Sequence, residues 1–349
     1  MLTPLIHAHG SRDSDDVVGA YVFSATLAVQ DITGTAYSGV TASHMSKRLE
    51  GSAESDALLF ALTSANAPRP IGPLGYPVVH ESDLADIAAW VFISLPLLED
   101  TGVIEATVTL DAAIAPLPGE YIPREPWAGA LSLIDDLSNR LSRPIRQIWV
   151  THSGDRTQVD TYLTEAGYDD VYREQQATFS LRNVRPTFTC DIVNDMNFAR
   201  KDVAGLRGVL GASSRDYPRG GLILDTVEWT EQRVRDAGAR LLDRGGNQLT
   251  ALARDDDGHI IGMAEAVHYD SDDDRLMELG LVYVLPLHRG GGVGKRMVHD
   301  VLAAAKEQWP DLETGYSSHP ADSAPVLALL LRLGLQGISF ATAWQKTED

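Results

Sequence analysis

The sequence has little cysteine, no excess of positive charge and no long apolar run. The single cysteine, Cys190, excludes an intramolecular disulfide and a cysteine-based zinc cluster. Lys and Arg number 29 against 49 Asp and Glu, a formal net charge of -20, so a phosphate backbone is repelled and no nucleic-acid partner is expected. No stretch of about 18 uncharged apolar residues and no leader-like N-terminus occurs. We therefore expect a cytoplasmic protein without a membrane partner.

The chain is long and apolar enough for two domains. Its 349 residues exceed the usual domain size of roughly 100 to 200 residues, and 44% hydrophobic residues suffice for two cores. Strand-like patterns at 171–181 and from 187 onward flank the segment 181–186, which ends in a proline that interrupts regular structure. We predict one domain over 1–182 and a second over 187–349.

The second half shows a mixed order of helices and strands. The turn signal Asp255-Asp256-Asp257-Gly258 predicts a hairpin, because Asp and Gly tolerate the positive φ of such turns. Antiparallel strands followed by a crossover helix favour an α/β (α+β) domain. The periodicity predicts helices over 198–210, 228–242, 293–308 and 324–332, and strands over 249–254, 259–267, 276–284, 313–317 and 337–344.

The first half repeats this order in weaker form. Both halves end in a helix, a glycine with a large apolar or aromatic residue, and a strand, at Gly167-Tyr168 and at Gly334-Leu335. An internal duplication accounts for this, and two unrelated α/β domains that share a helix cap are the alternative. The patterns predict strands over 57–64, 87–96, 102–110, 146–151 and 171–181, and helices over 128–141 and 157–166.

A glycine-rich loop joins a β-branched strand to an amphipathic helix at 282–298. Four glycines in five positions, Gly290 to Gly294, let backbone N–H groups approach a phosphate, and the helix N-terminus adds a positive dipole end. The spacing is not that of a dinucleotide fingerprint. Arg296 stands where a nucleotide-hydrolysing loop has its magnesium-binding hydroxyl. The loop therefore predicts a pyrophosphate site of another kind.

Residues 284–294 read Val284-Leu285-Pro286-Leu287-His288-Arg289-Gly290-Gly291-Gly292-Val293-Gly294. This segment resembles the signature Val-x-Pro-x-x-Arg-Gly-x-Gly-x-Gly of the GCN5-related N-acetyltransferases. The chain is similar to tandem members from high-GC Gram-positive bacteria, distantly mycothiol-synthase-like. The resemblance implies two tandem domains of this fold, each a mixed, mainly antiparallel sheet flanked by helices, and acetyl-CoA as co-substrate. It implies coenzyme contacts from Leu281, Val282, Tyr283, Val284, Arg289, Gly290, Gly291, Gly292, Val293, Gly294, Lys295 and Ser323.

The first half resembles the same fold without a working coenzyme loop. By position, Arg124-Glu125-Pro126-Trp127-Ala128-Gly129 corresponds to the signature, with Trp127 in place of a glycine. Pro126 lacks an N–H, and an indole would fill the cleft. We expect no acetyl-CoA binding in this half, which would support the fold, line the acceptor pocket or form an oligomer contact.

Acyl transfer to an amine needs a base for the amine, donors for the oxyanion and an acid for the thiolate. Glu278 is the first candidate base, because the resemblance places a glutamate there at the start of the separated strand. Glu265, a carboxylate in an otherwise apolar strand, is the alternative. The N–H groups of Val282 and Tyr283 are candidates for the thioester carbonyl.

The resemblance also places a tyrosine acid on the last helix, but Leu330 stands at that position. Ser323 replaces a coenzyme-contacting asparagine. Tyr316 and His319 are the candidate substitutes, the first through its phenol and the second through its near-neutral pKa, although packing and surface roles are the alternative readings. Water can also protonate the thiolate.

We expect no metal, since the acidic run 270–274 lacks the glycine and final glutamate of a calcium loop and indicates a solvated turn. The predicted function is transfer of an acetyl group from acetyl-CoA to a primary amine of a small-molecule acceptor, with a non-catalytic acyl-CoA-binding or regulatory module as the alternative. The region 216–235 would contribute to the acceptor pocket, and a homodimer is possible.

Overall fold

The computed structural model describes residues 2–10, 14–35, 41–270 and 275–348. Apart from Asp270, the acidic run 270–274 lies outside these residues. The chain divides into two compact units. Unit 1 comprises Met1–Arg173, Gly220–Asp225 and Ser339–Asp349, and unit 2 comprises Glu174–Arg219 and Thr226–Ile338. Within the described ranges, no helix combines the length and apolar character that a membrane span requires.

Unit 1 is built on one sheet with the strand order β1-β2-β3-β4-β5-β12, in which only β4 and β5 pair in parallel. Its strands are β1 (Thr3–Ile6), β2 (Ser55–Thr63), β3 (Ile87–Pro96), β4 (Val103–Leu110), β5 (Ile145–His152), the start of β6 (Asp169–Ser180) and most of β12 (Gln336–Thr347). Its helices are α1 (Ser14–Thr33), α2 (Ala42–Leu49), α3 (Arg124–Leu141) and α4 (Gln158–Glu165).

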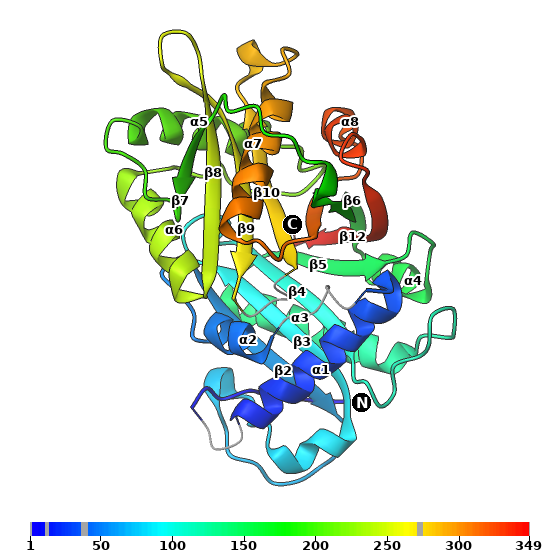
Figure 1. The fold of residues 1–349 in the computed structure, drawn as a ribbon. Coiled ribbons are helices and arrows are strands. Elements are labelled where there is room, and N and C mark those ends of the chain that lie inside the picture. The colour runs from blue at the N-terminus through cyan, green and yellow to red at the C-terminus, as the bar shows by residue number, and fades with distance from the viewer. Residues whose placement is uncertain (1, 11–13, 36–40, 271–274, 349) are drawn as a thin grey trace. The chain divides into compact units, whose positions relative to one another are not determined.

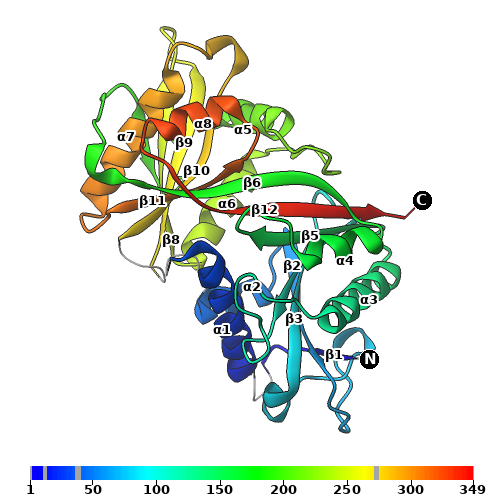
Figure 2. The same ribbon diagram turned by 90° about the vertical axis from the view of Figure 1, so that its right-hand side faces the viewer.

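The sheet of unit 1 is covered by helices on both faces because its strands alternate apolar side chains. Phe60 and Leu62 of β2 pack in the core under α3, whereas Leu59 and Ala61 pack in the core under α1 and α2. Figure 2 shows α1 and α3 on opposite sides of β2 and β3. The two-sided burial explains why these strands are almost continuously hydrophobic.

In unit 2 the strands follow the order β6-β11-β10-β9-β8-β7, in which only β10 and β11 pair in parallel. Its further strands are β7 (Asp191–Asn194), β8 (Gly246–Arg254), β9 (Ile260–Tyr269), β10 (Leu276–Val284) and β11 (Thr314–Pro320). Its helices are α5 (Val203–Asp216), α6 (Glu231–Asp243), α7 (Val293–Gln308) and α8 (Ala324–Leu331).

The sheet of unit 2 has the same layered plan. Met297 and Val301 of α7 are buried with Ala264 of β9, while Leu206 of α5 is buried with the neighbouring Met263 on the opposite face. In Figure 1, α7 runs across β8, β9 and β10. The hairpin predicted at 255–258 is present, and the N–H of Gly258 donates to the carbonyl of Asp255 at 3.0 Å.

Both units follow one order of elements: a strand, two helices, three antiparallel strands, a helix, a parallel strand, a helix and a strand. The last strands are exchanged. Residues 174–180 of β6 belong to unit 2, where they pair with β11, and residues 339–347 of β12 belong to unit 1, where they pair with β5. The repeated order agrees with an internal duplication, and the expected mixed sheets flanked by helices are confirmed.

The strand pattern predicted from Thr187 onward begins only at Asp191, because the buried carboxylate of Asp300 on α7 holds the preceding residues in a loop. Asp300 accepts hydrogen bonds from four successive backbone N–H groups, those of residues 187–190, and from the hydroxyls of Thr187 and Thr189. Burial alone would raise the pKa of Asp300, but these bonds lower it below the ordinary value. The carboxylate is therefore ionised at neutral pH and ties α7 to the start of β7.

We expect Asp300→Asn to lower the free energy of unfolding by about 3 kcal/mol, since an amide cannot accept all these bonds and leaves buried N–H groups unpaired. Because the pKa of Asp300 is depressed in the folded state, its contribution is complete above the ordinary aspartate pKa of about 3.9 and is lost as the pH falls through the folded value. Urea unfolding at neutral pH measures the difference. Asp311→Asn, at an exposed aspartate, is the control, and equal stabilities would contradict the prediction.

Candidate active site

The site begins where β10 leaves its parallel neighbour. β10 pairs with β11 only as far as Glu278 and Tyr316, and beyond this pair the two strands separate. On its other side β10 stays paired with β9, but the register shifts between Leu279 and Val282. This shift is a β-bulge, which re-aims the backbone of β10 next to the opening between the strands.

A glycine and a glutamate meet at the bulge. A side chain at Gly280 would lie 3.2 Å from both Cβ and Oε2 of Glu265, so only glycine lets the carboxylate lie this close to the β10 backbone. Glu265 accepts a hydrogen bond from the N–H of Leu281 at 3.2 Å. Burial raises the pKa of Glu265 to about 7, against the lowering effect of its bonds from Leu281 and Gln248. The carboxyl is thus balanced between its two protonation states near neutral pH.

The glycine loop follows β10 as predicted, and α7 starts at Val293. Gly290 and Gly292 have φ values of 85° and 74°, a left-handed conformation that side chains disfavour. No heavy atom lies within 4 Å of the position that a Cβ would take at Gly290 or Gly291, so the loop backbone is open to a ligand. The first N–H groups of an α-helix have no intrahelical acceptor. Those of α7 therefore form an anion-binding end beside the exposed side chain of Lys295.

Arg289 anchors the front of this loop. Its Nε donates to the carbonyl of Val284 at 2.8 Å, and its guanidinium carbon lies 5.2 Å from the ring centre of Tyr283. The Tyr283 hydroxyl donates to Asp216, whose Oδ2 also lies 3.5 Å from Nη2 of Arg289. Because these contacts fix the guanidinium while leaving it exposed, Arg289 offers a preorganised positive charge at the loop.

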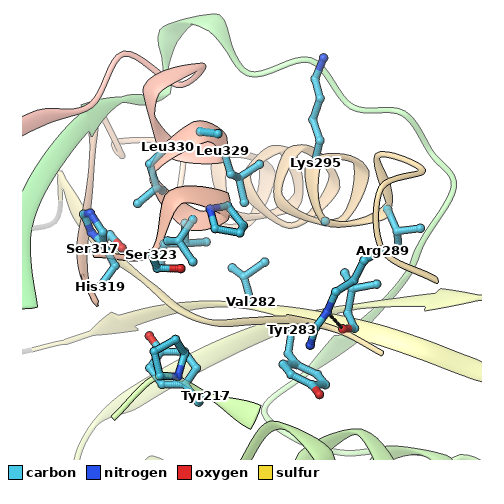
Figure 3. Close-up of a pocket in the computed structure, with 18 of the residues that line it drawn as sticks. Tyr217, Val282, Tyr283, Arg289, Lys295, Ser317, His319, Ser323, Leu329 and Leu330 are labelled. Atoms are coloured by element: carbon cyan, nitrogen blue, oxygen red, sulfur yellow. Dashed lines mark hydrogen bonds between the residues drawn. The ribbon is translucent and has the colours of Figure 1, made fainter. Parts of the chain in front are cut away.

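One cavity of about 730 Å³ connects the loop with the opening between the strands. Val282 points into the centre of the cavity, between α8 and the loop after α5, as Figure 3 shows. Apolar side chains dominate the wall. The wall includes Leu279, Gly280, Val282, Val284, Gly290, Gly292, Val293, Gly294, Val326, Leu329 and Leu330. A cavity with an anion-binding end and an apolar stem suits a ligand that carries phosphate at one end of an extended, less polar arm.

Polar groups occur at few places along the stem. Ser317 and His319 of β11 line it and are almost fully buried, and Ser323 lines it without using its hydroxyl to cap α8. Tyr217, which follows α5, lies on the opposite wall, and burial raises the pKa of its phenol to about 12. The position expected to hold a tyrosine acid holds the buried, apolar Leu330.

The structure brings most of the predicted coenzyme residues to the cavity wall. Leu281 and Gly291 are the two that do not line it, since the N–H of Leu281 donates to Glu265 and Gly291 lies exposed in the loop. Asp216 and Tyr217 lie within the region assigned to the acceptor pocket, but no spacing connects them with the loop. Their place in the site comes from tertiary structure alone.

The three predicted catalytic residues lie beside the cavity rather than in its wall. Glu278 is exposed, pairs with Val267 of β9 and with Tyr316 of β11, and contributes a smaller rise to the pKa of Glu265. Glu265 lies two residues from Val267 on β9, so its side chain is on the same face of the sheet as that of Glu278. Burial, and then the charge of Glu278, raises the pKa of Tyr316 above its ordinary value. These side chains form a polar group on the α5 and α6 face where the strands part.

Among the described residues, one group has the composition and closeness of metal ligands: Asp255, Asp257 and His259 in the turn between β8 and β9. The Asp255 carboxylate stabilises the turn, because it accepts hydrogen bonds from the N–H groups of Asp257 at 3.1 Å and His259 at 2.8 Å. The group is largely exposed and none of its members lines the cavity.

Comparisons with known proteins point to one family. The family model for the acetyltransferase (GNAT) family matches residues 214–334, and no curated protein matches the chain in sequence. The chain is similar to a tandem GNAT protein from the clavulanic acid biosynthesis pathway, with 15% identity, a TM-score of 0.68 and coverage of 99% of this chain and 98% of the other. It is also similar to a GCN5-related N-acetyltransferase from Sphaerobacter thermophilus, with 15% identity, a TM-score of 0.60 and coverage of 99% and 95%.

At these identities the likeness to solved structures is a likeness of fold, while the family match covers the stretch that holds the bulge, the loop and the cavity. The expected fold class of two tandem units is thereby confirmed. Residues 214–334 therefore match the acetyltransferase (GNAT) family model, in a chain that has the fold of a tandem GNAT protein.

Proposed function

We propose that this protein transfers the acetyl group of acetyl-CoA to a primary amine of a small-molecule acceptor, with its active site in unit 2. The observation that carries the proposal is the cavity that joins an anion-binding loop, Arg289 to Gly294, to the bulge in β10. The loop suits a pyrophosphate, the apolar stem suits a pantetheine arm, and the bulge places backbone N–H groups at the far end.

The binding residues follow from this arrangement. The N–H groups at the start of α7, together with the Arg289 guanidinium and the Lys295 ammonium, would hold the phosphates. The backbone of Val282 and Tyr283 would face the thioester carbonyl, whose oxygen gains negative charge during attack. When bound, acetyl-CoA supplies the acyl group as an activated thioester.

Glu265 is the base that we favour. A general base is most effective when its pKa lies near the working pH, and the pKa of Glu265 is about 7, whereas Glu278 is exposed. Glu265 also contacts the bulge directly, through the N–H of Leu281. The carboxylates of Glu265 and Glu278 would attract a cationic amine, and the ionised Glu265 would accept the proton that the amine loses.

A non-catalytic acyl-CoA-binding module is the second candidate, favoured by the apolar Leu330 in the wall where a proton donor is expected. Calorimetric titration with acetyl-CoA, combined with measurement of thiol release over a panel of amines, separates the two candidates. Binding with amine-dependent thiol release supports the transferase. Binding without release on any amine supports the module, and absence of binding contradicts both.

The proposal also predicts one acetyl-CoA per chain. In unit 1 the residues predicted to correspond to the loop form the first turn of α3, where Pro126 lacks an N–H and Trp127 is buried in the core. Arg124 is already paired with Glu165. We therefore expect a calorimetric stoichiometry of one, and a stoichiometry of two would show that unit 1 also binds the coenzyme.

A further inference from the structure

His319 on β11 is a buried polar side chain for which the described part of the chain offers no hydrogen-bond partner. It is 2% exposed, and neither Nδ1 nor Nε2 has a hydrogen-bond partner among the described residues. Burying an imidazole in this way is unfavourable, because both nitrogens lose their bonds to water. Of the described residues that have such buried, unpaired atoms, His319 alone lines the cavity. The imbalance therefore points to a ligand group in the cavity.

The register of the sheet gives the level at which His319 meets the cavity. The parallel pairing of β10 with β11 ends at Glu278 and Tyr316. Counted three residues along each strand from this last pair, His319 is level with Leu281, at the bulge, and not with the glycine loop that follows β10. In Figure 3, His319 and Ser317 lie on the side of the cavity away from Arg289. His319 is thus placed at the level of the reacting end of an acyl-CoA rather than at its phosphates.

We propose that the His319 imidazole donates a hydrogen bond to the sulfur of the acyl thioester and to the thiolate that leaves it, and so supplies the donor that is missing at Leu330. This inference rests on the proposed function. It goes further because it assigns the leaving-group contact to a residue on β11 rather than to one on α8.

The charge state of His319 agrees with a donor that does not itself transfer its proton. Burial lowers the pKa of His319, so the ring is neutral at physiological pH, with one N–H and one acceptor nitrogen. In the reaction the amine nitrogen attacks the carbonyl carbon and the C–S bond breaks, with its electron pair left on sulfur. The amine proton passes to Glu265, and solvent later protonates the thiolate. The His319 N–H stabilises the developing negative charge without leaving the ring.

The test uses the full chain and coenzyme A that carries an NMR-active carbon label beside the sulfur, so that the chemical shift reports ionisation of the bound thiol. In His319→Leu we expect the titration midpoint of this thiol to rise by about one to two pH units, because the thiolate loses its donor. We expect kcat for acetyl transfer to fall by about a hundredfold. Adding Leu330→Tyr to His319→Leu restores a donor from α8 and should reverse part of both changes.

Tyr217→Phe is the matched control, since this change removes a phenol donor from the opposite wall of the cavity and leaves His319 in place. The inference is overturned if the titration midpoint of the bound thiol is unchanged in His319→Leu. It is also overturned if this midpoint rises only in Tyr217→Phe. The proposed function fails separately, and this inference fails with it, if the unmodified chain does not bind coenzyme A at all. Thermal unfolding of each variant shows whether the fold is retained.

Discussion

A chain with Gly292→Val and Gly294→Val is expected to lose acetyl-CoA affinity by about a hundredfold or more, which corresponds to about 3 kcal/mol. Gly292 has a φ of 74°, where a β-branched residue is strained, and it is the N-cap of α7. A Cβ added at Gly294 would lie 3.6 Å from Cγ2 of Val284, at the junction of the loop and the stem. Both changes keep the phosphates away from the N–H groups. Isothermal calorimetry measures the loss.

Strain alone does not produce this loss, and Gly258 provides the control. Gly258 has a φ of 85°, and nothing lies within 4 Å of an added Cβ, but it belongs to the turn between β8 and β9, away from the cavity wall. Gly258→Val should lower stability without changing the affinity for acetyl-CoA. Equal affinities of the loop variant and the unmodified chain would remove the basis for a coenzyme site in this loop.

Replacing Glu265 with glutamine should reduce kcat/KM for the amine by about 10²- to 10⁴-fold, the usual contribution of a general base. Glutamine keeps the size of the side chain and an acceptor for the N–H of Leu281, so the bulge should persist. Binding of acetyl-CoA should therefore change little. Steady-state kinetics and calorimetry on the same preparation separate the two effects.

The pH dependence of acetyl-transfer activity tests whether Glu265 acts in its ionised form. A carboxyl group acts as a base only when it is ionised, and burial raises the pKa of Glu265 to about 7. Activity of the unmodified chain should rise as the pH increases through about 7 and fall below it. Glu265→Gln should remove this rise and Glu278→Gln should keep it. The opposite pattern would make Glu278 the base, in agreement with its first place among the candidates from sequence.

Features that depend on neighbouring residues could be predicted from the sequence. The glycine loop and the bounds of α7 follow from a local pattern, and β3 has the bounds that its apolar run predicts. Before residue 57 the sequence pattern predicts no helix or strand, although this segment contains β1, α1, α2 and the first residues of β2. In α1, Val17, Val18 and Tyr21 are buried while Phe23 is 65% exposed, so the helix has no clear apolar stripe.

Features that depend on distant residues could not be predicted. The sequence before Asp191 has the pattern of a strand. It forms a loop because its N–H groups donate to the buried carboxylate of Asp300, more than a hundred residues later in the chain. The same holds in the site. The pKa of Glu265 depends on burial against β10, and the place of Tyr217 in the cavity wall depends on the turn after α5. His319 was visible in the sequence as a titratable residue, but its lack of a partner is visible only in the folded chain.

The exchange of final strands has a consequence for biosynthesis. β5 takes its antiparallel partner from residues 339–347, which the ribosome makes only after residues 174–338, so the strand pairing of unit 1 stays incomplete while unit 2 is synthesised. At about 5–20 residues per second, the edge of β5 waits on the order of ten seconds or more for that partner. During this interval an unpaired edge is open to other nascent chains. The protein is therefore expected to depend on residues 339–347, and on chaperones, for a soluble yield.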